Sequence, residues 1–158
     1  MTTDTFTRET DGLRPIVSRL AALRTAGSRF PLSLLEFGMR MAVGATFFRS
    51  GMNKFESFDS AVELFREEYR LPLLPPEIAA TMGTAVELGA PVLLVLGLFA
   101  RLGAAALLAM TLVIQFLVYP GNWPEHLMWA SILAYVLTRG PGTLSIDRII
   151  AFNLFGRS

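Results

Sequence analysis

The chain has 158 residues, of which 53% are hydrophobic and 17% are charged, and its mean hydropathy is +0.49. Soluble domains usually carry about 25% charged residues, so this composition argues against a soluble domain and indicates one integral membrane domain. The net charge of +1 argues against a nucleic-acid partner. Because the sequence has no Cys and one His, it excludes thiolate and iron–sulfur chemistry, and we expect no metal site.

Residues 1–31 form a basic N-terminal arm with five arginines. The arm has no apolar core of the kind that a signal peptide requires. The segment 15–29 is expected to be a basic amphipathic helix on the inner leaflet, where anionic lipid attracts it. Residues 1–12 fit a disordered tail equally well.

Four apolar segments follow the arm and predict an all-α fold, an integral membrane four-helix bundle. The expected spans cover about residues 32–52, 78–100, 102–119 and 124–138. The first three approach or exceed the roughly 20 residues that cross a bilayer, whereas the fourth is short. It fits a tilted span, a re-entrant segment or an interfacial helix. The membrane domain is thus expected to occupy residues 32–150, with a short tail over 151–158.

Charge in the connections predicts the orientation. If four helices cross, nine basic residues lie on one side and Lys54, Arg66 and Arg70 lie on the other. The positive-inside rule then predicts a multi-pass protein of the bacterial plasma membrane with both termini in the cytoplasm.

The outer connection between the first two spans is expected to form an amphipathic helix on the bundle surface. Its apolar residues recur at helical steps of three and four, namely Phe55, Phe58, Val62, Phe65 and Tyr69. Three prolines, Pro72, Pro75 and Pro76, then end this helix before the second span.

Arg40 lies near the middle of the first span, on a helix face that it shares with Gly44, Phe47, Gly51 and Lys54. A central arginine costs about 2.5–3.5 kcal/mol on insertion scales and cannot escape this cost by deprotonation. Glu87, near the middle of the second span, is the expected partner. Such a pair either belongs to a functional site or only fixes the register of the two helices.

Further polar side chains converge in the expected outer half of the bundle. Intramembrane polar groups face the interior or a cavity, so six residues are predicted to line one ligand pocket: Arg40, Glu87, Thr111, Gln115, Tyr119 and His126. Two alternatives remain open, an ordinary interfacial aromatic belt for Tyr119 and a solvated helix start for His126.

Three blocks of the sequence resemble the DoxX family of small membrane proteins. The first-span block consists of Arg40, Gly44, Phe47, Gly51 and Lys54. The second joins Glu87 to Gly97 and Arg101, and the third comprises Gly140, Pro141, Gly142, Ser145, Ile146 and Asp147. The pattern departs at Ser50, where many relatives carry His. The likeness covers about residues 32–150 and implies a four-helix membrane bundle with a role in redox chemistry. The block from Phe65 to Glu77 resembles a subgroup linked to copper or thiol stress.

The resemblance and the polar cluster together predict an accessory subunit of a membrane redox or stress-response system that binds quinone in its outer half. No covalent cofactor is evident, and the chain has no residues for a redox centre of its own. Any enzymatic role would therefore be that of a quinone-linked oxidoreductase subunit with a membrane or periplasmic redox partner. The alternatives are a non-catalytic scaffold that docks a partner protein and a permease component for small solutes or metals. The oligomeric state is left open.

Overall fold

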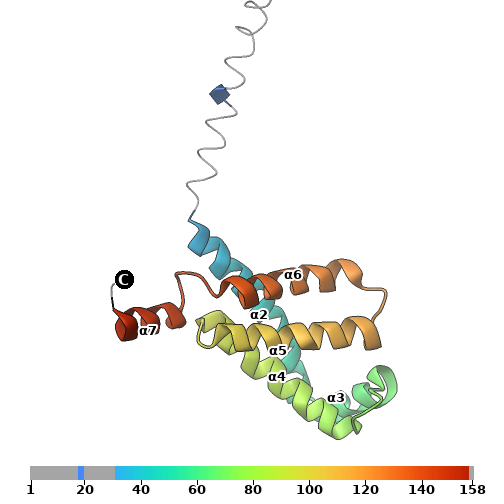
Figure 1. Ribbon diagram of the computed structural model, residues 1–158. Helices are drawn as coiled ribbons and strands as arrows, with labels where there is room; N and C mark the ends of the chain where they lie inside the picture. Colours follow the sequence, from blue (N-terminus) through green and yellow to red (C-terminus); the bar gives the residue numbers. More distant parts are fainter. Residues whose placement is uncertain (1–17, 20–30, 157–158) are drawn as a thin grey trace, which may run out of the picture. The chain divides into compact units, whose positions relative to one another are not determined.

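The computed structural model describes residues 18–19 and 31–156 (Figure 1). Two compact units divide the chain, Met1–Leu34 and Leu35–Ser158. In the first unit Ser18 and Arg19 are helical, and the other expectations for the N-terminal arm lie outside the described residues. Nearly all of the described residues belong to the second unit.

Every regular element in the described residues is helical, which confirms the all-α class. In chain order they are α2 (Leu32–Glu56), α3 (Phe58–Leu64), η1 (Phe65–Tyr69), α4 (Pro76–Leu96), α5 (Ala100–Val113), η2 (Ile114–Val118), α6 (Trp123–Arg139) and α7 (Ile146–Phe155). The segments η1 and η2 are single π-helical turns. Helix α7 occupies most of the region that was expected to be a short tail.

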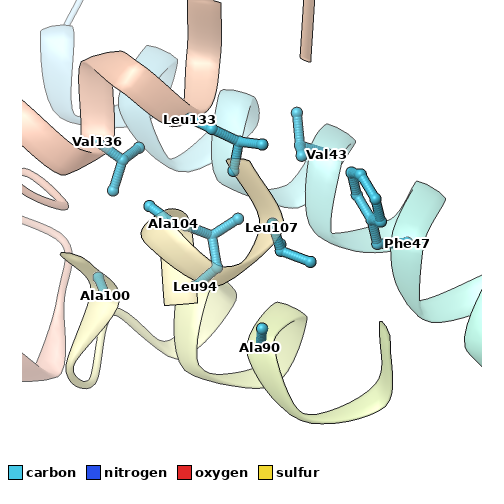
Figure 2. Packing of buried hydrophobic residues seen from close by; sticks show 9 residues of the cluster. All are labelled: Val43, Phe47, Ala90, Leu94, Ala100, Ala104, Leu107, Leu133 and Val136. Carbon is cyan, nitrogen blue, oxygen red and sulfur yellow. The ribbon is translucent and has the colours of Figure 1, made fainter. Parts of the chain in front are cut away.

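Helices α2, α4, α5 and α6 share one apolar core (Figure 2). Its buried members are Val43, Phe47, Ala90, Leu94, Ala100, Ala104, Leu107, Leu133 and Val136. Helix α5 packs against both α4 and α6 (Figure 1). Helix α2 joins them through edge-to-face packing of Phe47 on Trp129 of α6, with ring centroids 5.2 Å apart.

Two helices among the described residues are long and apolar enough to cross a membrane. They are Pro76–Leu96 and the continuous helix Ala100–Val118. Helix α2 has 25 residues and several charges, while α6 has 17 residues.

The boundaries of α2 and α4 differ from the predicted ones. Helix α4 ends at Leu96, four residues early, because Gly97 adopts φ +68° and takes the left-handed conformation that ends a helix. A Cβ on Gly97 would collide with the Cβ of Ser145, so the close approach of that segment also requires glycine. Helix α2 continues to Glu56, four residues beyond the predicted span, and this extension carries Lys54.

The connection after α2 is a two-part helical cap rather than one amphipathic helix. Phe65 is buried against Ala79 and Ala80 of α4, with Val62 and Tyr69 packed around them, as the stripe predicts. The prediction that Phe55 belongs to this apolar stripe is wrong, because Phe55 lies at the end of α2 and is 65% exposed.

The two ends of the bundle differ in construction. At the end that we call the latch end, the α4–α5 turn is tied to the segment 140–147. The backbone N–H of Asp147 donates to Gly97 O at 2.8 Å. The carboxylate of Asp147 in turn accepts from the N–H groups of Phe99 at 2.8 Å and Ala100 at 3.1 Å, capping α5. The opposite end, which carries α3, η1 and η2, is the cap end.

Candidate functional site

Arg40 lies at the latch end and is fully buried. Its Nη1 donates to Leu94 O at 3.1 Å and to Val95 O at 2.9 Å, and its Nη2 donates to Leu144 O. The carbonyls of Leu94 and Val95 belong to the last turn of α4, where a helix leaves carbonyls unpaired and carries partial negative charge. The guanidinium therefore caps the C-terminus of α4.

The predicted pairing of Arg40 with Glu87 is wrong. A Cβ on Gly51 would lie 2.8 Å from the Cβ of Glu87, so Gly51 is the α2 residue level with Glu87. Arg40 is eleven residues from Gly51, which is about 16 Å along a helix at 1.5 Å per residue. The prediction assumed that the midpoints of the two spans lie at one depth. The actual register is shifted because α2 extends further and α4 ends earlier.

The partner of Glu87 is Lys54. Lys54 Nζ donates to Glu87 Oε1 at 2.9 Å, to Glu87 Oε2 at 2.8 Å and to Ser50 Oγ at 2.8 Å. Ser50 Oγ donates to Glu87 Oε1 at 3.2 Å. Lys54 is 9% exposed and Glu87 is 4% exposed. All three ammonium hydrogens thus have acceptors, which a buried lysine requires. Ser50, at which the sequence departs from the expected pattern, is part of this network.

Gly97 and the third block of the pattern lie at the latch end. A Cβ on Gly142 would collide with the carboxylate of Glu36, and φ +82° at Gly142 also favours glycine. Glu36 Oε1 accepts from Tyr135 Oη at 2.9 Å. Gly140 adopts φ +90° and ends α6. Together with Pro141, Gly97 and Asp147, these residues hold the latch, and their contacts are structural.

The four polar residues predicted in the third and fourth spans form separate contacts. Gln115 Oε1 accepts from His126 Nδ1 at 2.7 Å, and Gln115 Nε2 donates to Pro120 O at 3.0 Å. Because Gln115 Oε1 can only accept, His126 Nδ1 carries the proton. Thr111 donates to Leu107 O within its own helix at 2.7 Å. Tyr119 Oη donates to Glu68 of η1.

An apolar cavity of about 240 Å³ lies at the cap end between η1, α4 and α5. Its wall includes Phe65, Met82, Gly83, Met110 and both π-helical turns. Glu87 is the one charged residue among those that line it, and Tyr69 supplies its one hydroxyl. π-Helical turns are frequent at functional sites, and here η1 and η2 meet beside the cavity.

A polar cleft of about 360 Å³ lies beside the same ion pair. Its wall contains Ser50, Asn53, Lys54, Ser57 and Ser60, among other residues. Tyr69 lines both spaces. Of the two partners in this ion pair, Lys54 therefore lines the polar cleft and Glu87 lines the apolar cavity.

Two tyrosines at the cap end are held protonated. Burial raises the pKa of Tyr69, and the nearby charges of Glu87 and Glu68 raise it further. Hydrogen bonding to the Glu68 carboxylate raises the pKa of Tyr119 well above its ordinary value. Both side chains are therefore neutral hydrogen-bond donors at physiological pH.

The structure brings together only part of the predicted site. Gln115 and His126 contact each other, whereas Arg40 lies at the latch end. Of the six predicted residues, Glu87 alone lines the apolar cavity. Sequence reasoning missed Lys54 and Tyr69 as neighbours of Glu87. One signal could have indicated Lys54, which is the only lysine in the chain and shares the helix face of Arg40 and Gly51.

These observations define an all-α protein with two helices apolar enough to cross a membrane and a buried ion pair whose partners line a polar cleft and an apolar cavity. Residues 35–120 match the family model for DoxX, which is more than half of the chain. The chain therefore belongs to the DoxX family. No curated protein and no solved structure matches this chain.

Proposed function

We propose that all four core helices cross the plasma membrane of a bacterium, with both termini in the cytoplasm and the cap end outside. Helices α2 and α6 share their core with the two apolar helices, which supports their crossing alongside them. With four spans, basic residues number nine on one side and three on the other. This asymmetry favours the latch end inside.

We further propose that the protein is an accessory subunit of a membrane redox or stress-response system and that its apolar cavity binds the head of a membrane quinone. One observation carries this proposal: the cavity is apolar except for Glu87 and Tyr69. Ligand sites typically combine an apolar lining with a few polar groups that fix orientation. The protonated Tyr69 hydroxyl is a donor suited to a quinone carbonyl oxygen.

The size of the cavity also fits a ring better than a whole lipid. Drug-sized ligand pockets occupy about 300–1,000 Å³, so a cavity of about 240 Å³ suits one ring, with the isoprenoid tail left among the lipids. The sequence offers no cysteine cluster or histidine pair for a redox centre. Electrons would therefore come from a membrane or periplasmic redox partner.

Quinone analysis of purified protein tests the proposal. Protein extracted in mild detergent should retain quinone that can be extracted with solvent and identified by chromatography with mass spectrometry. Ala109 lines the cavity, so Ala109→Phe should reduce the space in it and lower the amount of quinone retained. Ala45→Phe is the matched control, because Ala45 lies on α2 away from the cavity and lines a separate apolar groove.

Equal retention by the two variants, or no quinone in the wild type, would refute quinone binding in this cavity. The scaffold and permease hypotheses would then lead, and the ion pair would have to be explained without a quinone ligand.

A further inference from the structure

The Lys54–Glu87 pair is the most unusual buried feature of the described residues. Thirteen of the chain's fourteen basic residues are arginines, and the only lysine is this one. An arginine holds its proton under all physiological conditions, whereas a lysine gives up its proton readily when it is buried. The one side chain among the lysines and arginines that can release its proton therefore contacts a buried carboxylate at 2.8 Å.

The surroundings of the pair differ on its two sides. Lys54 and Ser50 line the polar cleft, together with Asn53, Ser57 and Ser60. Asn53, Ser57 and Ser60 are exposed, so the cleft opens to solvent at the cap end. Glu87 lines the apolar cavity instead. A proton that moves from the ammonium to the carboxylate therefore moves from a residue that lines the cleft to a residue that lines the cavity.

We propose that the Lys54–Glu87 pair is a proton relay between the polar cleft and the apolar cavity. In the first step the Lys54 ammonium gives one proton to the Glu87 carboxylate, leaving a neutral amine and a neutral carboxylic acid. In the second step the amine takes one proton from water in the cleft. The net result is one proton carried from the cleft to Glu87, a residue that lines the cavity.

One physical feature favours this transfer. The pair is neutral overall before and after the first step, so the transfer adds no net buried charge. Ser50 lies within hydrogen-bond distance of both partners and holds them together throughout.

Tyr69 and Glu68 are the other titratable groups near the pair, both on η1. Tyr69 stays protonated, and Glu68 accepts a hydrogen bond from Tyr119. Neither provides an equivalent path, because Lys54 is the only cation that an ion pair joins to Glu87 in the described residues. The relay does not depend on quinone being the ligand, although a quinone that accepts electrons would use such a proton.

Two reagents can trap the neutral amine of Lys54 and the neutral carboxylic acid of Glu87. The sample is the full-length protein in proteoliposomes with the cap end outward. An impermeant sulfonated succinimidyl acetate acetylates only neutral amines, and Lys54 is the only side-chain amine available. Lipid-soluble dicyclohexylcarbodiimide adds only to a protonated carboxyl. Amine attack on this adduct then joins Lys54 to Glu87 as an amide and releases dicyclohexylurea. Peptide mass spectrometry identifies each product.

Both reagents should react with the wild-type protein. An obstacle in the cleft should block only the acetylation of Lys54, and an obstacle in the cavity should block only the carbodiimide reaction at Glu87. Ala109→Phe should slow carbodiimide reaction at Glu87 and leave acetylation of Lys54 unchanged. Ser60→Cys with a bulky thiol reagent attached in the cleft should slow acetylation of Lys54 and leave the carbodiimide reaction at Glu87 unchanged. Lys54→Arg keeps the positive charge but holds its proton about a hundredfold more tightly, so reaction at Glu87 should fall by about that factor. Circular dichroism checks that each variant is folded.

Acetylation of Lys54 without reaction at Glu87 would overturn the relay, as would reaction at Glu87 without acetylation of Lys54. Reaction at neither would show a permanently charged structural pair. Quinone content measured on the same samples keeps the two proposals separate. Labelling of both residues without bound quinone would support the relay and refute the quinone ligand.

Discussion

Removal of one partner from the Lys54–Glu87 pair should strongly destabilise the protein. Glu87→Leu leaves an ammonium group that is 9% exposed with Ser50 as its one remaining partner. Breaking a buried pair in this way typically costs about 3–5 kcal/mol of unfolding free energy. Lys54→Met, which strands the carboxylate, should cost a similar amount. The double variant should cost far less, because apolar residues of similar volume often replace a buried pair with little loss.

A double-mutant cycle measures this difference. The unfolding free energy of the four proteins, followed by circular dichroism in mixed detergent micelles, should give a coupling of about 3 kcal/mol. The matched control is a cycle between Arg40→Met and Glu87→Leu, which should be additive within about 0.5 kcal/mol because the two groups share no partner and the guanidinium lies about 11 Å further along α4. Additivity for Lys54 and Glu87, or strong coupling for Arg40 and Glu87, would refute the register in which Gly51 lies level with Glu87.

Three further predictions concern packing, capping and topology. Gly51→Val should destabilise the bundle by about 1–3 kcal/mol because its side chain would collide with α4, whereas Gly38→Val, with open space around it, should cost much less in the same unfolding assay. Asp147→Ala should cost about 1 kcal/mol through the lost cap of α5, also measured by unfolding. In intact cells an impermeant thiol reagent should label Ser60→Cys and should label Ser158→Cys only after permeabilisation; early labelling of the latter would contradict four spans.

Helix faces could be predicted from the sequence because they depend only on local geometry. Arg40, Gly44, Phe47, Gly51 and Lys54 were predicted to share one face of the first span, and all five are buried. The same geometry places Gly83, Ala90 and Pro91 on the helix face of Glu87, and all three are buried. A rotation of 100° per residue is enough for these predictions.

The register between helices could not be predicted in the same way. It depends on where each helix ends, and the ends are fixed by contacts between distant segments. Gly97 ends α4 where Ser145 packs against it, and the hydrogen bond from Asp147 to Gly97 O comes from a segment about fifty residues away. Nothing near Glu87 in the sequence shows that Gly51, rather than Arg40, lies opposite it.

The π-helical turns were a second feature that made the site hard to predict from the sequence. A π-helical turn inserts an extra residue into a helix and rotates the side chains beyond it. The segment η2 lies directly before Tyr119, so the face that a regular helix would assign to Tyr119 changes there. Tyr119 consequently reaches Glu68 on the cap rather than the predicted pocket.

The two buried cations of α2 have different roles, and the difference follows from their chemistry. Arg40 donates to three backbone carbonyls from α4 and the latch, so it needs a planar group that is always charged and can reach several acceptors at once. Lys54 contacts only side chains, and it lies between a polar cleft and an apolar cavity. Exchange of the two residue types would place a titratable cation in the structural position and a permanent cation in the position that we propose to exchange protons. The arrangement therefore gives the latch end a role in fixing the fold, and it leaves the cap end for the ligand and proton chemistry that we propose.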